Sequence, residues 1–157
     1  MNITPTGIDT LSGRARLPSG TDVVDLNVQG GSITKTLVNT VATGLFEVAL
    51  AASTTCGGMI FLNVTGSGGG DFQSVTSIIT YTAVNKAGTI SSQVSTSGTQ
   101  TYVTALSGGT SLVAVPSITA GASKITINIT ATSDITTPTL TAKYQIFTES
   151  SQAITLV

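Results

Sequence analysis

The sequence contains neither histidine nor tryptophan, has a single cysteine, and carries charge on only 8% of its 157 residues. Without histidine, the usual general base of a hydrolytic triad and a principal zinc ligand are both missing. Cys56 cannot form a disulfide within the chain, and we expect it to be a small, buried apolar residue. We therefore predict no triad, no metal centre and no cofactor.

Positive charge is scarce and scattered. Six basic and seven acidic residues give a formal net charge of -1, and Arg14 and Arg16 are the one close pair of cations. A groove that tracks nucleic acid phosphates needs several Lys or Arg side chains on one face, so direct nucleic acid binding is not expected. No apolar run is long enough for a transmembrane helix, and no signal peptide is visible at the first residues.

Acidic and nucleophilic residues form no recognisable catalytic set. Asp22 and Asp25 are three positions apart, and Ser123 is adjacent to Lys124, so in extended strands the members of each pair point to opposite faces. The isolated acids could meet only through the fold; they are Glu47, Asp71, Asp134 and Glu149. We expect the protein not to be an enzyme, and the alternative is a polysaccharide hydrolase or lyase with spatially assembled carboxylates.

Hydroxyl side chains dominate what is present. Thirty Thr and eighteen Ser make up nearly a third of the chain, and they alternate with Val, Ile and Leu. Alternation of apolar and polar positions is typical of a strand with one buried and one solvated face, and β-branched Thr favours the extended backbone. The sequence predicts an all-β protein.

Period-2 segments recur from residue 22 onward, separated by turn signals about every ten residues. The expected strands include 46–50, 59–65, 75–84, 125–131 and 140–146, and the expected turns are 66–70, 86–88, 97–99, 108–109, 120–122 and 136–138. Segment 59–65 is apolar on both faces, which predicts a central strand covered on each side. The pattern favours about ten strands in a β-sandwich, jelly-roll-like or immunoglobulin-like.

Residues 1–21 differ from the rest, because they contain Pro and Gly but no sustained periodicity. We expect them to form an extended N-terminal arm ahead of a single β-sandwich domain at 22–157. Arg14 and Arg16 are the candidate partner-binding residues of this arm, and the alternative is an exposed pair without a partner.

Four of the seven aromatic residues fall in alternating strands, which predicts a place in the core rather than on a sugar-stacking platform: Phe46, Phe61, Tyr81 and Tyr144. The glycine-rich segment 66–70 is followed by another strand. A phosphate-binding loop is followed by a helix, so this segment is predicted to be a flexible hairpin tip.

Several segments resemble small virion structural proteins of tailed bacteriophages: GLFEVAL at 44–50, CGG at 56–58, YTAVNKAGT at 81–89, KITI at 124–127, and TPTL at 137–140 with Tyr144. The similarity spans residues 44–147. It implies a β-sandwich subunit, often trimeric, that attaches to the outside of the head as a decoration or cement protein. The implied partner is the major capsid protein, with an N-terminal arm making part of the contact, and no catalytic residues are implied.

The leading hypothesis is therefore a capsid decoration protein, made in the host cytoplasm and located on the outer surface of the virion capsid. A surface this poor in charge, with a mean hydropathy of +0.40, also predicts burial against other copies or a partner, and thus an oligomer. The resemblance implies that this oligomer is a homotrimer. The alternative is a tail fibre or receptor-binding tip that recognises a host ligand through loops 66–70 and 108–109. Fibres commonly place a long shaft before the tip, and the 157 residues contain none.

Overall fold

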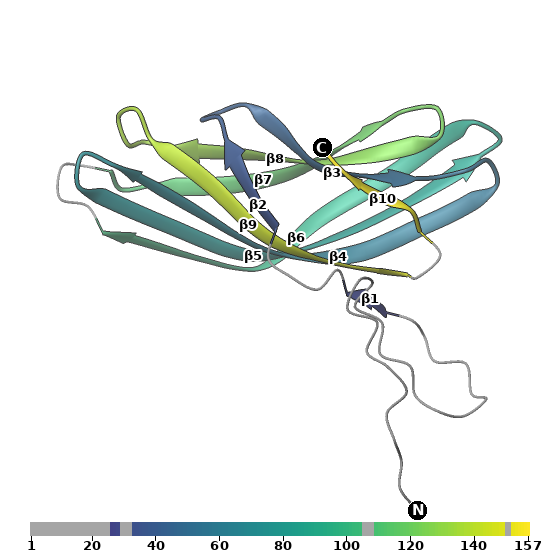
Figure 1. The fold of residues 1–157 in the computed structure, drawn as a ribbon, viewed down its shortest axis with the longest axis horizontal. Coiled ribbons are helices and arrows are strands. Elements are labelled where there is room, and N and C mark those ends of the chain that lie inside the picture. Colours follow the sequence, from purple (N-terminus) through teal and green to yellow (C-terminus); the bar gives the residue numbers. More distant parts are fainter. Residues whose placement is uncertain (1–25, 29–32, 105–108, 150–151) are drawn as a thin grey trace, which may run out of the picture.

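The protein is an all-β sandwich, seen in a computed structural model that describes residues 26–28, 33–104, 109–149 and 152–157. Ten antiparallel strands and no helix are present in these residues, so the predicted fold class is confirmed. The predicted N-terminal arm, residues 1–21, lies outside the described residues. Figure 1 shows the two sheets as two layers joined by loops at both ends.

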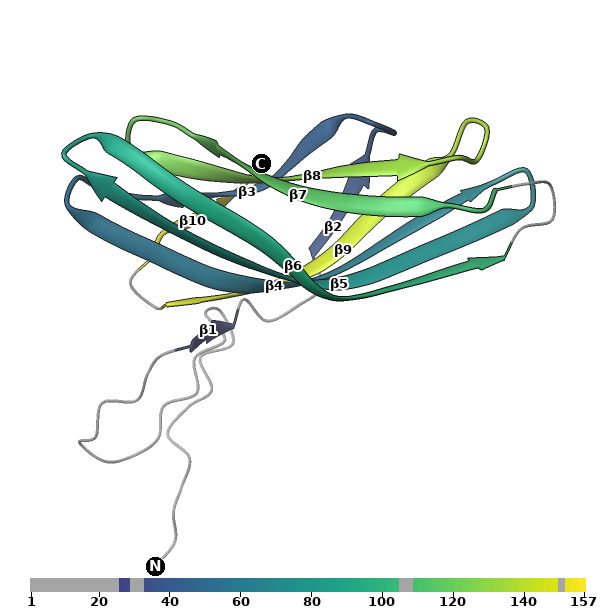
Figure 2. The ribbon, with the colours of Figure 1, turned by 180° about the vertical axis from the view of Figure 1, so that it is seen from behind.

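The larger sheet has six strands, and β1 and β2 pair with the same neighbour, β9. Its order from that edge is β1 (Leu26–Val28) and β2 (Ile33–Leu37), then β9 (Thr139–Glu149), β4 (Thr54–Gly68), β5 (Asp71–Lys86) and β6 (Thr89–Thr104). The smaller sheet has the order β10 (Ile154–Leu156), β3 (Ala42–Ala49), β8 (Lys124–Ser133) and β7 (Leu112–Ala120). The free edges β6 and β7 run past one another on the side seen in Figure 2.

Two tight turns join the long strands of the larger sheet. Gly69 and Gly70 connect β4 to β5, and Ala87 and Gly88 connect β5 to β6, with all four residues at positive φ. Two consecutive positive φ values are the signature of the type I′ turn, whose twist matches that of paired strands. The hairpin predicted at 66–70 is therefore confirmed, although its turn comprises only the last two glycines.

The turn predicted at 97–99 is wrong, because β6 continues through it as one strand. Its pairing with β5 shifts between Thr76 and Ile78, and two residues of β6, Gly98 and Thr99, lie opposite Ser77. Gly98 has φ +60, which a glycine accommodates readily. This β-bulge changes which side chains of β6 face the core. Even-numbered residues such as Ile90 and Val94 face the core before the bulge, whereas the even-numbered Tyr102 after it faces outward.

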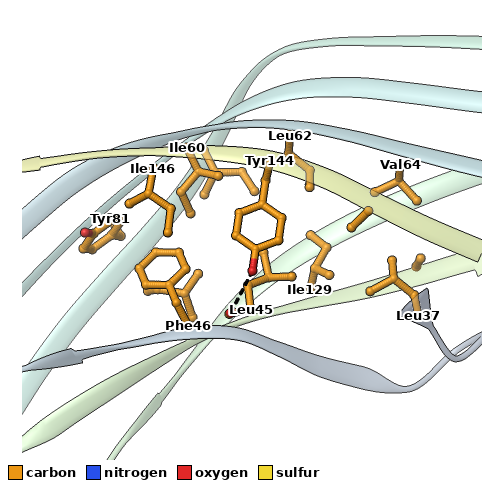
Figure 3. Close-up of a cluster of buried hydrophobic side chains, with 14 of the residues drawn as sticks. Leu37, Leu45, Phe46, Ile60, Leu62, Val64, Tyr81, Ile129, Tyr144 and Ile146 are labelled. Atoms are coloured by element: carbon orange, nitrogen blue, oxygen red, sulfur yellow. Dashed lines mark hydrogen bonds between the residues drawn. The ribbon is translucent and has the colours of Figure 1, made fainter. Parts of the chain in front are cut away.

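The core between the sheets is centred on aromatic side chains from three strands (Figure 3). The rings of Phe46 and Tyr81 meet edge to face at 5.9 Å, and those of Phe46 and Tyr144 stack at 6.5 Å. The Tyr144 hydroxyl donates a hydrogen bond to the Leu45 carbonyl oxygen at 2.8 Å, which links the two sheets. Cys56 is buried, as predicted. Core burial is thus combined with one polar link between the layers.

Burial acts on both core tyrosines. It raises the pKa of Tyr81 and of Tyr144 to about 12, because the phenolate would lose its solvation. A raised pKa in the folded state contributes stability below the ordinary pKa of about 10, which is lost as pH rises toward 12. The two hydroxyls differ in their partners: the Tyr81 oxygen has no hydrogen-bond partner of good geometry among the described residues. The nearby Thr148 hydroxyl acts to lower the Tyr81 pKa, but it donates to the Gly57 carbonyl oxygen at 3.2 Å.

Strand β4 is central, as its sequence predicts, but it is not covered on both sides. It lies between β9 and β5, and Ile60 and Leu62 face the core. On the outer face, Phe61 is 40% exposed and its ring meets that of Phe147 edge to face at 5.2 Å. The prediction that Phe61 is a core residue is therefore wrong, whereas it is confirmed for Phe46, Tyr81 and Tyr144.

Candidate interaction surface

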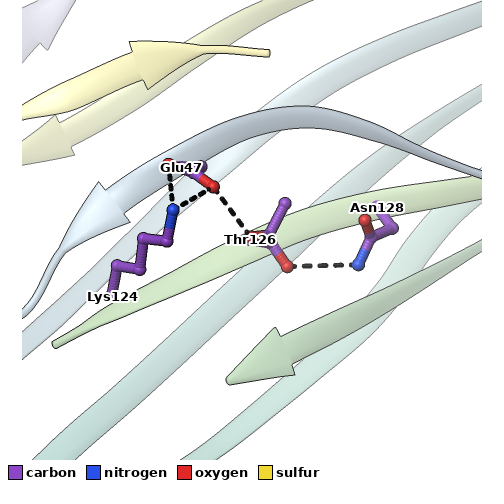
Figure 4. A network of polar contacts seen from close by, with 4 residues as sticks. All are labelled: Glu47, Lys124, Thr126 and Asn128. Atoms are coloured by element: carbon purple, nitrogen blue, oxygen red, sulfur yellow. Dashed lines mark hydrogen bonds and ion pairs between the residues drawn. The ribbon is translucent and has the colours of Figure 1, made fainter. Parts of the chain in front are cut away.

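The outer face of the smaller sheet carries little charge. Lys124 and Glu47 form an ion pair at 2.7 Å, and Glu47 also accepts a hydrogen bond from Thr126 at 3.4 Å (Figure 4). This is the only ion pair between side chains in the described part of the chain. The Lys124 side chain is half exposed, so the pair contributes little stability, about 0–1 kcal/mol. The face is nearly neutral beyond this pair.

Exposed valine side chains lie at the two edges of the same face, and we call the pair on β7, Val113 and Val115, the valine patch. Val113 and Val115 project from β7, and Val115 is 55% exposed. Val157 follows β10 and reaches Gly44, where an added Cβ would meet its Cγ2 at 3.0 Å. Gly44 therefore leaves room for Val157 against β3. Exposed apolar side chains on a face of low charge suit a contact that excludes water.

The outer face of the larger sheet is different, because it is hollowed and aromatic. Phe72 on β5 is 63% exposed and Tyr102 on β6 is 75% exposed. A hollow of about 390 Å³ lies beside them and is also lined by Thr65, Ser67 and Ser74. Tyr102 is paired directly with Ser74 of β5, and Phe72 precedes Ser74 by two residues on β5. The β-bulge at Gly98 is what turns Tyr102 toward this outer face.

Beneath this hollow, on the core side, a polar network closes one end of the sandwich. We call Asp71, Gln73, Ser133 and Asp134 the clamp. Gly109 N donates to Asp71 Oδ2 (2.9 Å), Gln73 Nε2 donates to Asp134 Oδ1 (2.7 Å), and Ser133 Oγ donates to Gln73 Oε1 (2.6 Å). The clamp therefore ties the start of β5 to the end of β8 and to the segment that leads into β7.

Asp134 is held in its ionised form. The backbone N–H groups of Ser111 and Thr110 donate to its two oxygens at 2.9 and 2.8 Å, and these bonds lower the pKa of the carboxyl well below its usual range. The fold thus brings Asp71 and Asp134 into one network, a possibility that the sequence alone did not exclude. A carboxyl group acting as a general acid needs a raised pKa, whereas that of Asp134 is lowered and its oxygens are occupied by hydrogen bonds that hold a loop.

The other residues weighed from the sequence form no common site within the described part of the chain, and Asp22 and Asp25 lie outside that part. Lys124 Nζ contacts Glu47, and the carbonyl oxygen of Ser123 accepts a hydrogen bond from Leu50 N. Arg14 and Arg16 lie outside the described residues. Among the residues that the structure describes, no group of three or more potential ligands could hold a metal ion, and no helix could span a membrane.

Sequence reasoning missed Phe72 and Tyr102 as surface residues. A signal for Phe72 was present: Val75, Ile79 and Tyr81 fix the odd positions of β5 in the core, so an even position points outward. For Tyr102 no such signal was available, because its direction depends on the β-bulge.

Comparison with known proteins gives little. No family model matches the chain, and no curated protein matches it. Among solved structures, the chain is similar to the tailspike protein of Acinetobacter baumannii phage AM24, with a TM-score of 0.45 and 9% sequence identity. The match covers 78% of this chain and 26% of the tailspike, so the chain spans about a quarter of that protein's length.

Proposed function

We propose that this chain is a structural protein of a bacteriophage virion, which decorates the outside of the head as a homotrimer and binds the major capsid protein. The observation that carries the proposal is the exposure of ten large apolar side chains in the described residues of a chain with only 8% charged residues. The sequence resemblance to virion structural proteins supports the same assignment. Such a surface is stabilised when it is covered by copies or by a partner.

The valine patch is the surface we assign to these contacts. Apolar burial contributes roughly 25 cal/mol per Å², and the contribution repeats at every subunit of a shell. Because the face carries a single ion pair, head binding should depend weakly on salt concentration. Stabilisation of the shell would then come from many neutral contacts rather than from a few strong ion pairs.

Cosedimentation of the purified protein with undecorated heads tests this assignment. Val115→Asp should bind heads at least about tenfold more weakly, because the contact would bury an unpaired carboxylate. Val84→Asp is the matched control, since Val84 is 46% exposed on the outer face of the other sheet, and it should bind normally. Equal binding by both variants would exclude the valine patch.

The location is tested separately by cryo-electron microscopy of virions and by the molar mass in solution. We expect density on the shell and a trimer by analytical ultracentrifugation. Density at the tail tip instead would assign the chain to a fibre, and a strict monomer at micromolar concentration would contradict the homotrimer.

The role of the N-terminal segment rests on the sequence alone. We propose that Arg14 and Arg16 pair with acidic groups of the capsid protein. The Arg14→Ala/Arg16→Ala double variant should then lose head affinity, while Lys86→Ala, a cation at an exposed turn, should not. Unchanged binding by the double variant would refute this role.

A further inference from the structure

We infer that the hollow between Phe72 and Tyr102 binds a neutral saccharide. Its volume, about 390 Å³, lies within the range of small-ligand sites, about 300–1,000 Å³, and it opens on the outer face of the larger sheet. It is separate from the valine patch, which lies on the outer face of the other sheet. The inference therefore does not depend on which virion structure the chain belongs to.

The chemistry of the lining matches a sugar. Two exposed rings, Phe72 and Tyr102, offer apolar faces against which the C–H face of a pyranose can pack. The hydroxyls of Thr65, Ser67 and Ser74 line the same hollow and can both donate and accept hydrogen bonds, as sugar hydroxyls do.

The lining also selects against charged ligands. Among the residues that the structure describes, none that lines the hollow is Lys, Arg, Asp or Glu. A sulfated or carboxylated ligand would lose solvation without gaining a counter-charge. The ligand that complements this surface is therefore a neutral hexose or N-acetylhexosamine unit.

Both rings are carried by backbone that is fixed from below. Phe72 lies between Asp71 and Gln73, which belong to the clamp, and Asp71 in turn accepts a hydrogen bond from Gly109 N. Tyr102 is paired through β6 with Ser74. Ser74 Oγ accepts a hydrogen bond from Asn63 Nδ2 at 2.9 Å, so this hydroxyl is also held in place. A preorganised platform loses less entropy when a ligand binds.

Size argues for a small ligand rather than a protein at this place. A stable protein interface buries about 800 Å² on each partner, and it usually surrounds its aromatic anchors with further apolar contact. Here two rings and three Thr and Ser hydroxyls line one small hollow. That arrangement provides stacking and hydrogen bonds over an area the size of one or two sugar rings.

The test is a binding screen by saturation-transfer NMR with neutral di- to tetrasaccharides of glucose, galactose, mannose and N-acetylglucosamine, together with sialylated and uronic acid oligosaccharides. We expect at least one neutral compound to bind, and Tyr102→Ala and Phe72→Ala each to weaken it about five- to tenfold. Val84→Ala, an exposed apolar residue on the same face but outside the hollow, should leave binding unchanged.

Three outcomes would overturn the inference: no neutral saccharide binds, an acidic compound binds more tightly, or binding survives both aromatic substitutions. Urea unfolding of each variant controls for folding, and both side chains are exposed enough that their loss should leave the core intact. Head binding measured on Tyr102→Ala separates this inference from the proposed function. If that variant loses head binding and the wild-type protein binds no sugar, the hollow is a protein contact and the inference is wrong.

Discussion

The middle and the ends of the sandwich are stabilised in different ways, although a single strand, β5, passes through all three regions. In its middle the core-facing residues are mainly apolar, with Val75, Ile79 and Tyr81 buried. At one end it buries Asp71 and Gln73 in the clamp, and at the other it buries Asn85. The middle holds the sheets together, whereas the ends hold loops in place.

The Asn85 end shows how one side chain can organise several connections. Asn85 Nδ2 donates to the Leu50 carbonyl oxygen at 2.8 Å, and Asn85 Oδ1 accepts from Gly88 N at 2.8 Å. Its backbone oxygen accepts from Ser53 N at 2.7 Å. Buried polar groups cost stability unless they are paired, so such residues are placed where loop backbone needs partners. The comparison teaches that burial alone does not identify what a residue contributes.

The largest effect on stability is expected from a substitution in the middle of the sandwich. Phe46→Ala should lower the free energy of unfolding by about 3–5 kcal/mol, because it leaves a cavity between the rings of Tyr81 and Tyr144. Urea unfolding measures it. Phe72→Ala is the control of the same chemistry at an exposed site and should change stability by less than about 0.5 kcal/mol. Similar losses for both variants would contradict the assignment of core and surface.

The contrast between these two phenylalanines also shows what the sequence could predict. The alternation of β-branched and polar residues was enough for the fold class, for most of the strands and for the core role of Phe46, but it divided β6 at 97–99. Phe61 was misassigned, because an apolar side chain on a central strand has the same sequence pattern whether its face is covered or open. The convergence of Asp71 and Asp134 depends on which loops share an end, and sequence spacing does not contain that information.

The next effect is at the Asn85 end. Asn85→Ala should destabilise the protein by about 2–3 kcal/mol, since the Leu50 carbonyl oxygen and Gly88 N–H lose their partner. Asn63→Ala removes an amide on the outer face, where water can replace its bonds to Ser74 and Thr76, and it should cost less than about 1 kcal/mol. Thermal unfolding of the two variants measures both losses of stability. An equal loss would contradict the role of Asn85 in holding the loops at this end.

A smaller effect separates two hydroxyls inside the core. Tyr144→Phe should cost about 1 kcal/mol, because the Leu45 carbonyl oxygen loses its donor. Tyr81→Phe should be neutral or stabilising, because the hydroxyl it removes is buried without a hydrogen bond in the described structure. The urea midpoints of the two variants provide the measurement. A Tyr81→Phe variant that is less stable than Tyr144→Phe would contradict the prediction.

The smallest effect concerns Asp134, which is exposed. Its folded pKa lies below the ordinary value, so it contributes stability above about pH 4 that is lost as pH falls toward the folded pKa. Wild-type protein should therefore be more stable than Asp134→Asn at about pH 6, and the difference should shrink toward about pH 2. Thermal unfolding at the two pH values measures it. A difference that grows on acidification would contradict the ionised clamp.

The β-bulge absorbs the extra residue in β6 at Gly98, so both halves of the strand stay paired with β5. Deleting a single residue there would restore one-to-one pairing, with Thr99 opposite Ser77, and Tyr102 would stay opposite Ser74 and face outward. A one-codon deletion at this point would thus remove the bulge without changing which side chains the second half of the strand exposes. Between related chains, a one-residue gap at this position would therefore not by itself predict a change in surface chemistry.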